Sequence, residues 1–436
     1  MALGGGTFLV PNKVLPGTYI NFVSKSKAQA DLSDRGYVAV ALPLSWGESG
    51  EIITLHSEDV IKECIKLLGY PYMADEMLPI RELFKNAKVV YVYNTRSTGV
   101  KARSNDSLID ARYGGIVGNN ISVEVKKTID DDSVFEFITR IKDTIVDYQK
   151  DTLVNIKDNK FVTFGNKAEL KDGIHMLSNG TDGTVSNSAY EDFLRKIDPY
   201  YFNVITVATN DEKTKRLLVE YTKRQREDVG AKFQAVVHDL KDKVNYEGVV
   251  DIINKVKGEE DNGQLVYWVA GALGGCQVNK SCTNKIYDGE YTVEANYDQA
   301  TLKELKLKGK FVMHMVGDDV RVLSDINTFV DFSKDKTKDF SKNQTIRVLD
   351  QLAIDTASLF NRKYLGKVPN DSAGRIELWK DIVLLHQTYQ TLRAIENFND
   401  KDIVIEKGPE KDQVIVTDNI IPVNAMEQLY MTVIVG

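Results

Sequence analysis

The sequence predicts a multidomain protein of mixed α/β and α+β class, with a β-sandwich inserted into an α/β body. Short alternating strands, separated by Gly, Asn and Asp clusters, fill residues 94–179, which is typical of a small antiparallel β-sandwich. Strands and helices alternate over residues 180–332, which predicts a layered α/β domain. Residues 333–424 combine two long helical patterns with short strands, which predicts an α+β domain before a terminal strand.

The first predicted strand lies in an N-terminal arm. Gly4, Gly5 and Gly6 are a flexible leader, prolines hold the following chain extended, and Thr18–Val23 is strand-prone. A basic start followed by an apolar segment is absent, so no secretory signal is predicted. After the arm, the pattern predicts strands at Gly36–Leu44 and Ala87–Tyr93, and a helix at Ser57–Leu68 with Ser57 as its N-cap.

The remaining elements follow from the same periodicities. In the β-sandwich we expect strands at Ile121–Lys127, Val134–Ile141, Thr144–Tyr148 and Phe161–Phe164. In the α/β segment we expect helices at Tyr190–Ile197, Glu212–Val229 and Gly263–Leu273, strands at Phe202–Ala208 and Phe233–Val237, and a hairpin of Lys310–Val316 with Val320–Val322. In the last domain we expect helices at Gln344–Asn361 and Arg375–Phe398, and strands at Ile403–Glu406 and Val414–Thr417.

The most informative segment is Gln428–Val435, a strongly β-prone run at the end of the sequence. Leu429, Met431, Val433 and Val435 would line one face of this strand. A terminal apolar strand cannot turn back into a hairpin and presents an open edge. It therefore completes either the sheet of its own domain or that of a neighbouring subunit, and the strand-bearing N-terminal arm favours the neighbour.

Composition restricts the function. The 436 residues suggest two to four domains, and a net charge of −7 gives no electrostatic support for binding nucleic acid. No apolar run approaches the ~18 residues of a membrane span. The three cysteines, Cys64, Cys276 and Cys282, favour synthesis in a reducing cytoplasm without disulfides, and the absence of a neighbouring histidine argues against a zinc site.

Catalytic motifs are weak. The glycines of Gly271–Gly275 lack the lysine of a phosphate-binding loop, and no GxSxG nucleophile motif is present. His238 and Asp239 directly follow a predicted strand, where α/β enzymes keep catalytic groups, so an α/β hydrolase-type enzyme is the alternative interpretation. We otherwise predict no catalytic, cofactor-binding or metal-binding residue, and hence no enzyme.

Several stretches of the sequence resemble those of contractile phage tail sheath proteins, in particular from Gram-positive myophages and R-type phage-tail-like bacteriocins. They include GGGTFLVPNKVLPGTYINFVS followed by RGYVAVALPLSWG, then AKVVYVYNTRSTGVKA, MLSNGTDGTVSNSAYEDFL, VYWVAGALGGCQVNKSCTNKIY, GRIELWKDIV and DNIIPVNAMEQLYMTVIV. The resemblance covers essentially the whole chain.

The resemblance implies a domain plan. The central domain of this family is described as subtilisin-like, which implies a shape and not a protease, because the HGT and GTSxAxP contexts of that protease are absent. The expected parts are an N-terminal arm (1–23), the N-terminal part of the body (24–93), the β-sandwich (94–179), the subtilisin-like α/β domain (180–332), the α+β C-terminal domain (333–424) and a C-terminal donor strand (425–436).

The resemblance also implies a function. Such proteins form stacked hexameric rings in a helical tube around an inner tail tube, and contraction of the tube drives the inner tube through the target cell envelope. The implied partners are other copies of the chain, the inner tube protein, and baseplate and tail terminator proteins, without nucleic acid or membrane insertion. The implied location is a virion or phage-tail-like particle made in the bacterial cytoplasm. A non-contractile structural oligomer remains a second alternative.

The resemblance further implies that subunits are linked by strand exchange, and this assigns roles to particular residues. The subunit-linking strands would contain Thr18, Tyr19, Ile20, Phe22, Val23, Leu429, Met431, Val433 and Val435. The candidate acceptor strands contain Ile403, Val404, Ile405, Val414, Ile415 and Val416. Candidate inner-tube contacts are Arg375, Glu377 and Lys380, and candidate hinges are Gly17 and Asp418–Gln428.

Overall fold

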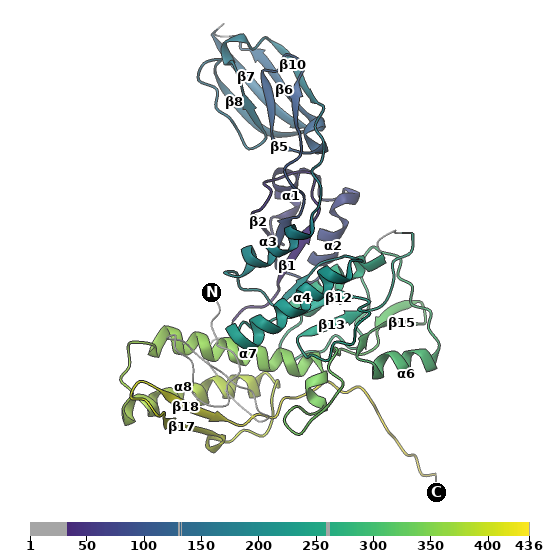
Figure 1. Cartoon of the computed structure of the whole chain (residues 1–436), viewed down its shortest axis with the longest axis vertical. Coiled ribbons are helices and arrows are strands. Elements are labelled where there is room, and N and C mark those ends of the chain that lie inside the picture. The colour runs from purple at the N-terminus through teal and green to yellow at the C-terminus, as the bar shows by residue number, and fades with distance from the viewer. Residues whose placement is uncertain (1–32, 130, 132, 259–261, 436) are drawn as a thin grey trace. The chain divides into compact units, whose positions relative to one another are not determined.

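The computed structural model describes residues 33–129, 131, 133–258 and 262–435. The described chain forms two compact units (Figure 1), which we treat separately. The sandwich unit comprises residues 39–84 and 88–198, and the body unit comprises the other described residues. The predicted N-terminal strand Thr18–Val23 lies outside the described residues.

Outside the β-sandwich, the described part of the sandwich unit contains three α-helices and strands of a seven-stranded sheet. Its strands are β1 (Tyr37–Leu42), which begins in the body unit, β2 (Ile52–His56) and β3 (Val89–Asn94), and its helices are α1 (Val60–Leu68), α2 (Leu78–Phe84) and α3 (Asn187–Ile197). β2 pairs antiparallel with β3. The N-cap of α1 is Asp59 and not the predicted Ser57, because the helix begins at Val60. The Ser57 N–H donates to the Lys88 carbonyl oxygen at 2.9 Å. Ser57 therefore belongs to the connection of the sheet.

The β-sandwich is built from seven strands in the order β8-β7-β6-β10-β4-β5-β9. Their bounds are β4 (Lys101–Ser104), β5 (Ile109–Gly114), β6 (Ile121–Lys127), β7 (Val134–Ile141), β8 (Thr144–Thr152), β9 (Val162–Phe164) and β10 (Gly173–Ser178). β10 pairs with β6 through its first four residues and with β4 through its last two. β10 thus divides the strands into two halves, β8-β7-β6 and β4-β5-β9. The two halves face each other, since the rings of Phe137 in β7 and Phe164 in β9 lie 6.1 Å apart. Along β6 and β7, buried residues alternate with partly buried ones, which agrees with a sheet that has one face in the core.

The body unit contains a parallel sheet in the order β14-β13-β12-β11. These strands are β11 (Val204–Thr206), β12 (Gln234–His238), β13 (Val249–Ile252) and β14 (Lys310–Phe311), and the helices of this part are α4 (Glu212–Arg224), α5 (Val266–Gly275) and α6 (Gln299–Leu307). α5 is buried nearly all round, because its sequence is apolar on every side. Helices that connect parallel strands are the arrangement that the alternating pattern predicted.

The predicted strand Lys310–Val316 is in fact two strands. β14 pairs with β13, whereas β15 (Met313–Val316) forms a hairpin with β16 (Asp319–Val322). At the point where the chain leaves β13, the Met313 N–H donates to the Asn254 side chain, at Oδ1, at 2.7 Å. This hydrogen bond replaces the pairing with β13.

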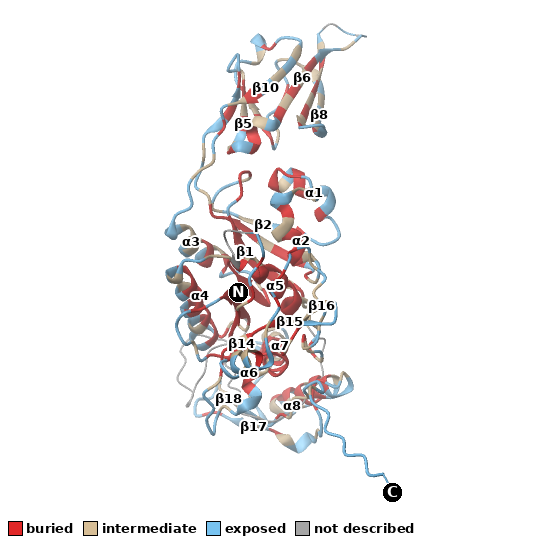
Figure 2. Cartoon of the chain, turned by 90° about the vertical axis from the view of Figure 1, so that its right-hand side faces the viewer, coloured by how far each residue is buried: buried red, intermediate tan, exposed pale blue. Residues whose placement is uncertain are grey.

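The C-terminal part of the body unit contains α7 (Asn343–Leu359), α8 (Ser372–Thr391) and the hairpin of β17 (Ile403–Lys407) and β18 (Val414–Asp418). Burial is concentrated along α5 and α7 (Figure 2). Arg226 donates to both carboxylate oxygens of Asp350 at 2.6 and 2.7 Å, and both side chains are buried, so this ion pair attaches α7 to the segment after α4. α8 ends before the predicted Phe398 because Arg393 adopts a left-handed φ of 58° and the Ala394 N–H returns to the Tyr389 carbonyl oxygen.

Short helical segments complete the described chain. The 3-10 turns are Asp75–Met77, Ile116–Asn120, Lys167–Glu169, Asn262–Leu265, Lys338–Ser341 and Asp400–Asp402, and π-helical turns at Gln225–Val229 and Phe360–Tyr364 follow α4 and α7. In the part of the chain that the structure describes, no helix combines the length and hydropathy of a membrane span.

Candidate functional site

The C-terminal segment 428–435, which we call the arm, runs away from the body unit as an extended chain (Figure 1). It pairs with no strand of the described chain. Both of its faces are open to solvent: Leu429 is 87% exposed and Val433 is 69% exposed on one face, and Tyr430 and Ile434 are exposed on the other. A continuous apolar segment of this kind is uncommon on an isolated protein and marks an interaction site. The predicted donor residues of the C-terminus therefore lie together and uncovered.

The residues just before the arm, 420–427, are held firmly, and we call them the root. Gln344, at the start of α7, accepts the Ala425 N–H at 2.9 Å and donates from Nε2 to the Val423 carbonyl oxygen at 3.0 Å. A bridge between Ile395 and Pro422 joins the root to the chain that follows α8. The root is therefore part of the folded body, and the arm begins only after it.

Glu427, the last residue of the root, is bound by Thr283, Ser324 and Lys342 from three other segments, and we call these contacts the clasp. Its carboxylate accepts from Thr283 Oγ1 at 2.9 Å, Lys342 Nζ at 2.5 Å and Ser324 Oγ at 3.3 Å, and its side chain is only 16% exposed. Burial opposes ionisation, but the hydrogen bond and charge of Lys342, with smaller contributions from Thr283 and Lys306, lower the pKa of Glu427. Glu427 is therefore an ionised anchor at the point where the arm starts.

The six predicted acceptor residues meet in the β17–β18 hairpin. Five residue pairs align the two strands, from Ile403 opposite Asp418 to Lys407 opposite Val414. Ile403 is buried against α8, where Trp379 Nε1 donates to its carbonyl oxygen at 3.1 Å, whereas Val404 and Val416 face solvent. Among the described residues this sheet has only two strands. Such a sheet is small and gains most from a further strand.

A buried histidine fixes the hairpin to α8. His386 Nε2 lies 2.7 and 2.8 Å from the two carboxyl oxygens of Asp418, and Nδ1 lies 3.1 Å from the Ile382 carbonyl oxygen. Burial and the charge of Asp402 raise the pKa of Asp418 well above its ordinary value. Both ring nitrogen atoms of His386 therefore have a hydrogen-bond partner. The end of β18 is thereby locked to the helix.

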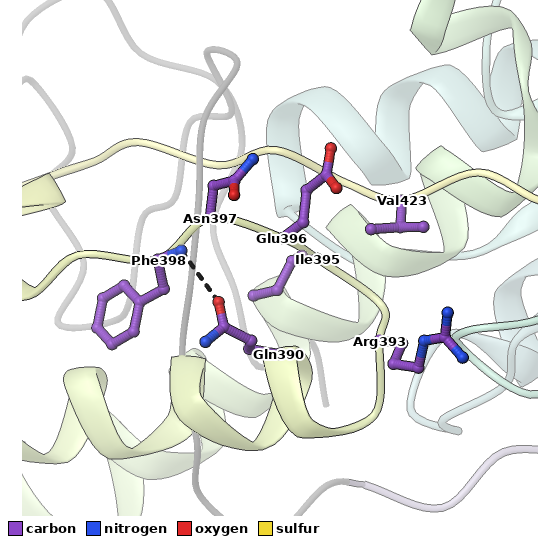
Figure 3. Close-up of a pocket in the computed structure, with 7 residues that line it drawn as sticks. All are labelled: Gln390, Arg393, Ile395, Glu396, Asn397, Phe398 and Val423. Carbon is purple, nitrogen blue, oxygen red and sulfur yellow. Dashed lines mark hydrogen bonds between the residues drawn. The ribbon is translucent and has the colours of Figure 1, made fainter.

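A pocket of about 460 Å³ opens beside the root. Its lining residues are Gln390, Arg393, Ile395, Glu396, Asn397, Phe398 and Val423 (Figure 3). The Phe398 N–H donates to Gln390 Oε1 at 3.0 Å, and Asn397, like Arg393, has a positive φ. The pocket results from the early end of α8, after which the chain folds back along the root.

The three predicted tube-contact residues lie in the first half of α8 with different surroundings. Arg375 donates to the Asn370 carbonyl oxygen and Oδ1, both at 3.0 Å, so its charge is turned onto its own helix start. Glu377 pairs with Lys363 at 2.9 Å, and Lys380 is exposed. The structure brings them to one helix but not into one cluster.

The exposed face of α8 carries apolar residues that the sequence analysis did not single out. Ile376 and Leu384 are 54% and 55% exposed, one helical repeat on either side of Lys380. They were not recognised because the opposite face of α8, which packs in the core, carries a stronger apolar stripe.

The alternative enzyme site at His238 and Asp239 is not favoured. His238 is buried and its Nε2 faces the Asn254 carbonyl oxygen at 3.1 Å, which is an interaction that fixes a ring inside a fold. The Asp239 carbonyl oxygen accepts from Lys215. Within the described residues no group of three or more His, Cys, Asp or Glu side chains is placed to hold a metal ion.

The attachment of the root through Glu427 was not apparent from the sequence. Glu427 was included only in the broad hinge Asp418–Gln428, although it is the last charge before the apolar run, and that position could have marked it as an anchor. Its partner Thr283 is 144 residues away, so no local pattern could have revealed the contact. The His386–Asp418 pair was missed for the same reason.

Comparison with known proteins identifies the class of this architecture. Four phage tail sheath family models match in order: the domain III N-terminal region described for the tail sheath protein Gp18 at residues 35–94, the β-sandwich domain at 97–182, the central domain at 183–328 and the C-terminal domain at 335–436. The chain belongs to the phage tail sheath family.

Individual relatives span nearly the whole chain. The crystal structure of a sheath tail protein from Desulfitobacterium hafniense is 32% identical, covers 95% of this chain and 99% of its own, and has a TM-score of 0.80. The phage-like element PBSX protein XkdK of Bacillus subtilis is 29% identical over 99% of both chains. The helical sheath of the anti-feeding prophage in its contracted state is 12% identical over 97% of this chain and 99% of its own, with a TM-score of 0.58, and is similar in fold.

Proposed function

We propose that this chain is the structural subunit of a contractile tail sheath that polymerises helically around an inner tube. Contraction of this sheath drives the tube through the target cell envelope. The observation that carries the proposal is the exposed apolar arm, anchored at Glu427, in a chain whose own C-terminal hairpin has two strands in the described residues. Family membership and the fold shared with a contracted sheath support it.

Subunits are linked by strand exchange in this proposal. The face of Leu429, Met431, Val433 and Val435 packs on a neighbour's α8 side, while the backbone of the arm adds a third strand to the neighbour's β17–β18 hairpin. Added main-chain hydrogen bonds provide affinity, and alternate side chains provide register. Thr18–Val23 of the N-terminal arm supplies the second donor strand.

The remaining parts follow the expected plan. The central domain at 180–332 is subtilisin-like in shape and has a structural role, without catalysis or cofactor. The sandwich at 94–179 is carried as an insertion, between the body at 24–93 and the central domain, and 333–424 is the C-terminal domain. The hinge that permits contraction lies after Glu427, because the hydrogen bonds of Gln344 and the clasp hold the residues before it.

Other copies of the chain in stacked hexameric rings, the inner tube, and baseplate and terminator proteins are the partners in the assembled particle. The exposed stripe of Ile376, Lys380 and Leu384 on α8 supports an inner-tube contact there better than Arg375 does. The assembled location is a virion or phage-tail-like particle whose subunits are made in the host cytoplasm.

Negative-stain electron microscopy of the full chain and of a truncation after Glu427 tests the proposal. We expect wide striated tubes from the full chain, with tube protein added as a nucleus where needed, and monomers from the truncation. The matched substitutions are Val433→Asp on the face expected to be buried and Thr432→Asp on the other face. Tubes from the truncation would refute strand exchange and keep the sheath, whereas monomers from every sample with tube protein would refute the sheath.

A further inference from the structure

The first residues that the structure describes, 33–35, are held by side chains of α7. The Ser33 N–H donates to Asp355 Oδ1 at 2.8 Å, and the Ser33 carbonyl oxygen accepts from Gln351 Nε2 at 3.0 Å. Arg35 Nη1 donates to Gln351 Oε1 at 3.2 Å. Both backbone polar groups of Ser33 are therefore bound by one helix that lies more than 300 residues further along the chain.

Asp355 is the centre of this contact. It is only 2% exposed, and its carboxylate accepts from the Ser33 N–H, from Gln351 Nε2 at 3.2 Å and from the Tyr389 hydroxyl at 2.7 Å. Gln351 and Tyr389 are buried as well. Buried polar groups of this kind keep a fixed arrangement, because a hydrogen bond that is left unmade inside a protein is costly. Asp355 therefore fixes Ser33 to the interior of the body unit.

The same face of α7 also holds the root of the C-terminal arm. Gln344, Gln351 and Asp355 stand at positions i, i+7 and i+11, within about 40° of one another around the helix axis. Gln344 binds the root through the two hydrogen bonds described above, and Thr345 Oγ1 donates to Asn424 Oδ1 at 3.1 Å. Eleven residues of helix span about 17 Å. One buried helix thus holds the chain beside each of the two proposed donor strands.

We propose that Asp355 is a positioning residue for the N-terminal link between subunits, and that one face of α7 holds both links of each subunit. This inference rests on the strand exchange proposed above, in which Thr18–Val23 and the arm are the donor strands. Tension between the two links then passes along a single buried helix, from Asp355 to Gln344.

The anchor at Ser33 also sets the free length of the N-terminal link. The chain stays attached from Arg35 onward without it, because Arg35 Nε donates to the Cys276 carbonyl oxygen at 3.0 Å and Asn203 Oδ1 accepts from the Gly36 N–H at 2.9 Å. Loss of the hold on Ser33 would release residues 33 and 34, which add about 7 Å of extended chain to the link. The subunit would remain folded, but its link would be slack.

Hydrogen exchange of the unassembled full-length protein, resolved to single amides, tests the anchor without any assembly. In the unaltered chain we expect the Ser33 amide to exchange slower than in an unfolded peptide by about tenfold or more. Asp355→Ala should remove this protection, while the Ala425 amide in the root keeps its rate. Asp350→Asn is the matched control, because this buried carboxylate of the same helix binds Arg226 and neither link. It should leave the Ser33 amide unchanged although it lowers the overall stability.

Asp355→Asn is a second variant for the case that the alanine variant does not fold. It keeps the volume of the side chain and one oxygen atom, but a neutral oxygen is a weaker acceptor than a carboxylate, so exchange at Ser33 should be about fivefold faster. A Ser33 amide without protection in the unaltered chain, or one with the same rate in both variants as in the unaltered chain, would overturn the anchor.

Negative-stain electron microscopy of sheaths assembled on tube protein tests the role of the anchor in the link. We expect irregular or absent sheaths from Asp355→Ala, with ring spacings that vary by up to about 7 Å, and regular sheaths from Asp350→Asn. Faster exchange at Ser33 together with sheaths as regular as those of the unaltered chain would overturn the linking role and leave the sheath proposal intact. Absence of sheaths from the unaltered chain would overturn the proposed function and with it the linking role, whereas the exchange rates still decide whether Asp355 anchors Ser33.

Discussion

Replacing Glu427 by Gln should release the root of the C-terminal arm without unfolding the protein. The substitution keeps the shape of the side chain and an oxygen that can accept from Thr283, but it removes the charge that Lys342 binds at 2.5 Å. A hydrogen bond to a charged group contributes about 1.5–3 kcal/mol. Because both side chains are only partly shielded, at 16% and 21% exposure, we expect a loss of about 2 kcal/mol, in the lower half of that range.

Hydrogen exchange measures this loss where it acts. The Val423 N–H donates to the Ala394 carbonyl oxygen and the Ala425 N–H donates to Gln344, so both amides exchange only when the root opens. A loss of about 2 kcal/mol corresponds to an exchange rate about 30-fold faster at these two amides. Amides in the central strands should keep their rates, since the opening is local.

The matched control is Glu304→Gln, which removes the same charge from an exposed pair with Lys308 on α6. A pair of this kind contributes less than about 0.5 kcal/mol, so the control should leave exchange unchanged. If Glu427→Gln alters exchange at Val423 and Ala425 by less than about twofold, the clasp does not anchor the root and the reasoning is wrong.

Three further predictions concern stability and pH. Asp350→Asn should lower the free energy of unfolding by about 3 kcal/mol in chemical denaturation, because Arg226 is left buried without its charge partner; a loss below about 1 kcal/mol would contradict this. Gly69→Ala should lower it by about 2–4 kcal/mol, since φ is +81° and the added Cβ would lie 2.7 Å from Trp46; an unchanged midpoint would show that the indole can move aside. The lowered pKa of Glu427 means that its stabilising contribution is complete above the ordinary carboxyl pKa and is lost as the pH falls through the lowered value. Protection of the Ala425 amide should therefore be constant from about pH 7 to 5 and decrease below about pH 4; loss of protection already at about pH 6 would point to another group.

Elements with strong periodicity could be predicted from the sequence, and elements defined by partners could not. β6 and β7 begin and end at the predicted residues, because strict alternation of apolar residues defines both a strand and its buried face. β2 (Ile52–His56) and β13 were not predicted, although both are rich in β-branched residues, because a run of four or five residues is too short to be assigned by periodicity.

The end of α8 shows a second limit. The apolar stripe continues through Leu392, Ile395 and Phe398, so periodicity alone extends the helix. The helix ends because Arg393 adopts a left-handed conformation. Glycine or asparagine at this position would have indicated the helix end, whereas arginine does not. Tertiary packing offsets the cost of this backbone conformation, because Ile395 is buried in the apolar cluster with α7.

The strands of the proposed assembly site could be predicted from composition, whereas the contacts that attach the arm to the body unit could not. The predicted strands Ile403–Glu406 and Val414–Thr417 and the arm appear as β-prone runs in the sequence. The structure pairs the first two as a hairpin, which the sequence analysis did not predict. That the chain is immobilised up to Glu427 depends on Lys342, Thr283 and Ser324, which come from two distant loops and the start of a helix. No spacing rule connects such positions.

Because the clasp fixes the chain at Glu427, the arm has a defined reach from that point. Eight residues lie from Gln428 to Val435, and an extended chain advances about 3.3 Å per residue, so the arm reaches about 26 Å from Glu427. In the strand exchange proposed above, a neighbouring hairpin that receives the whole strand has to lie within that radius in every state of the assembly. A rearrangement that carries it farther has to open the clasp or peel the strand, so the anchor position sets the largest step that linked subunits can make while they stay connected.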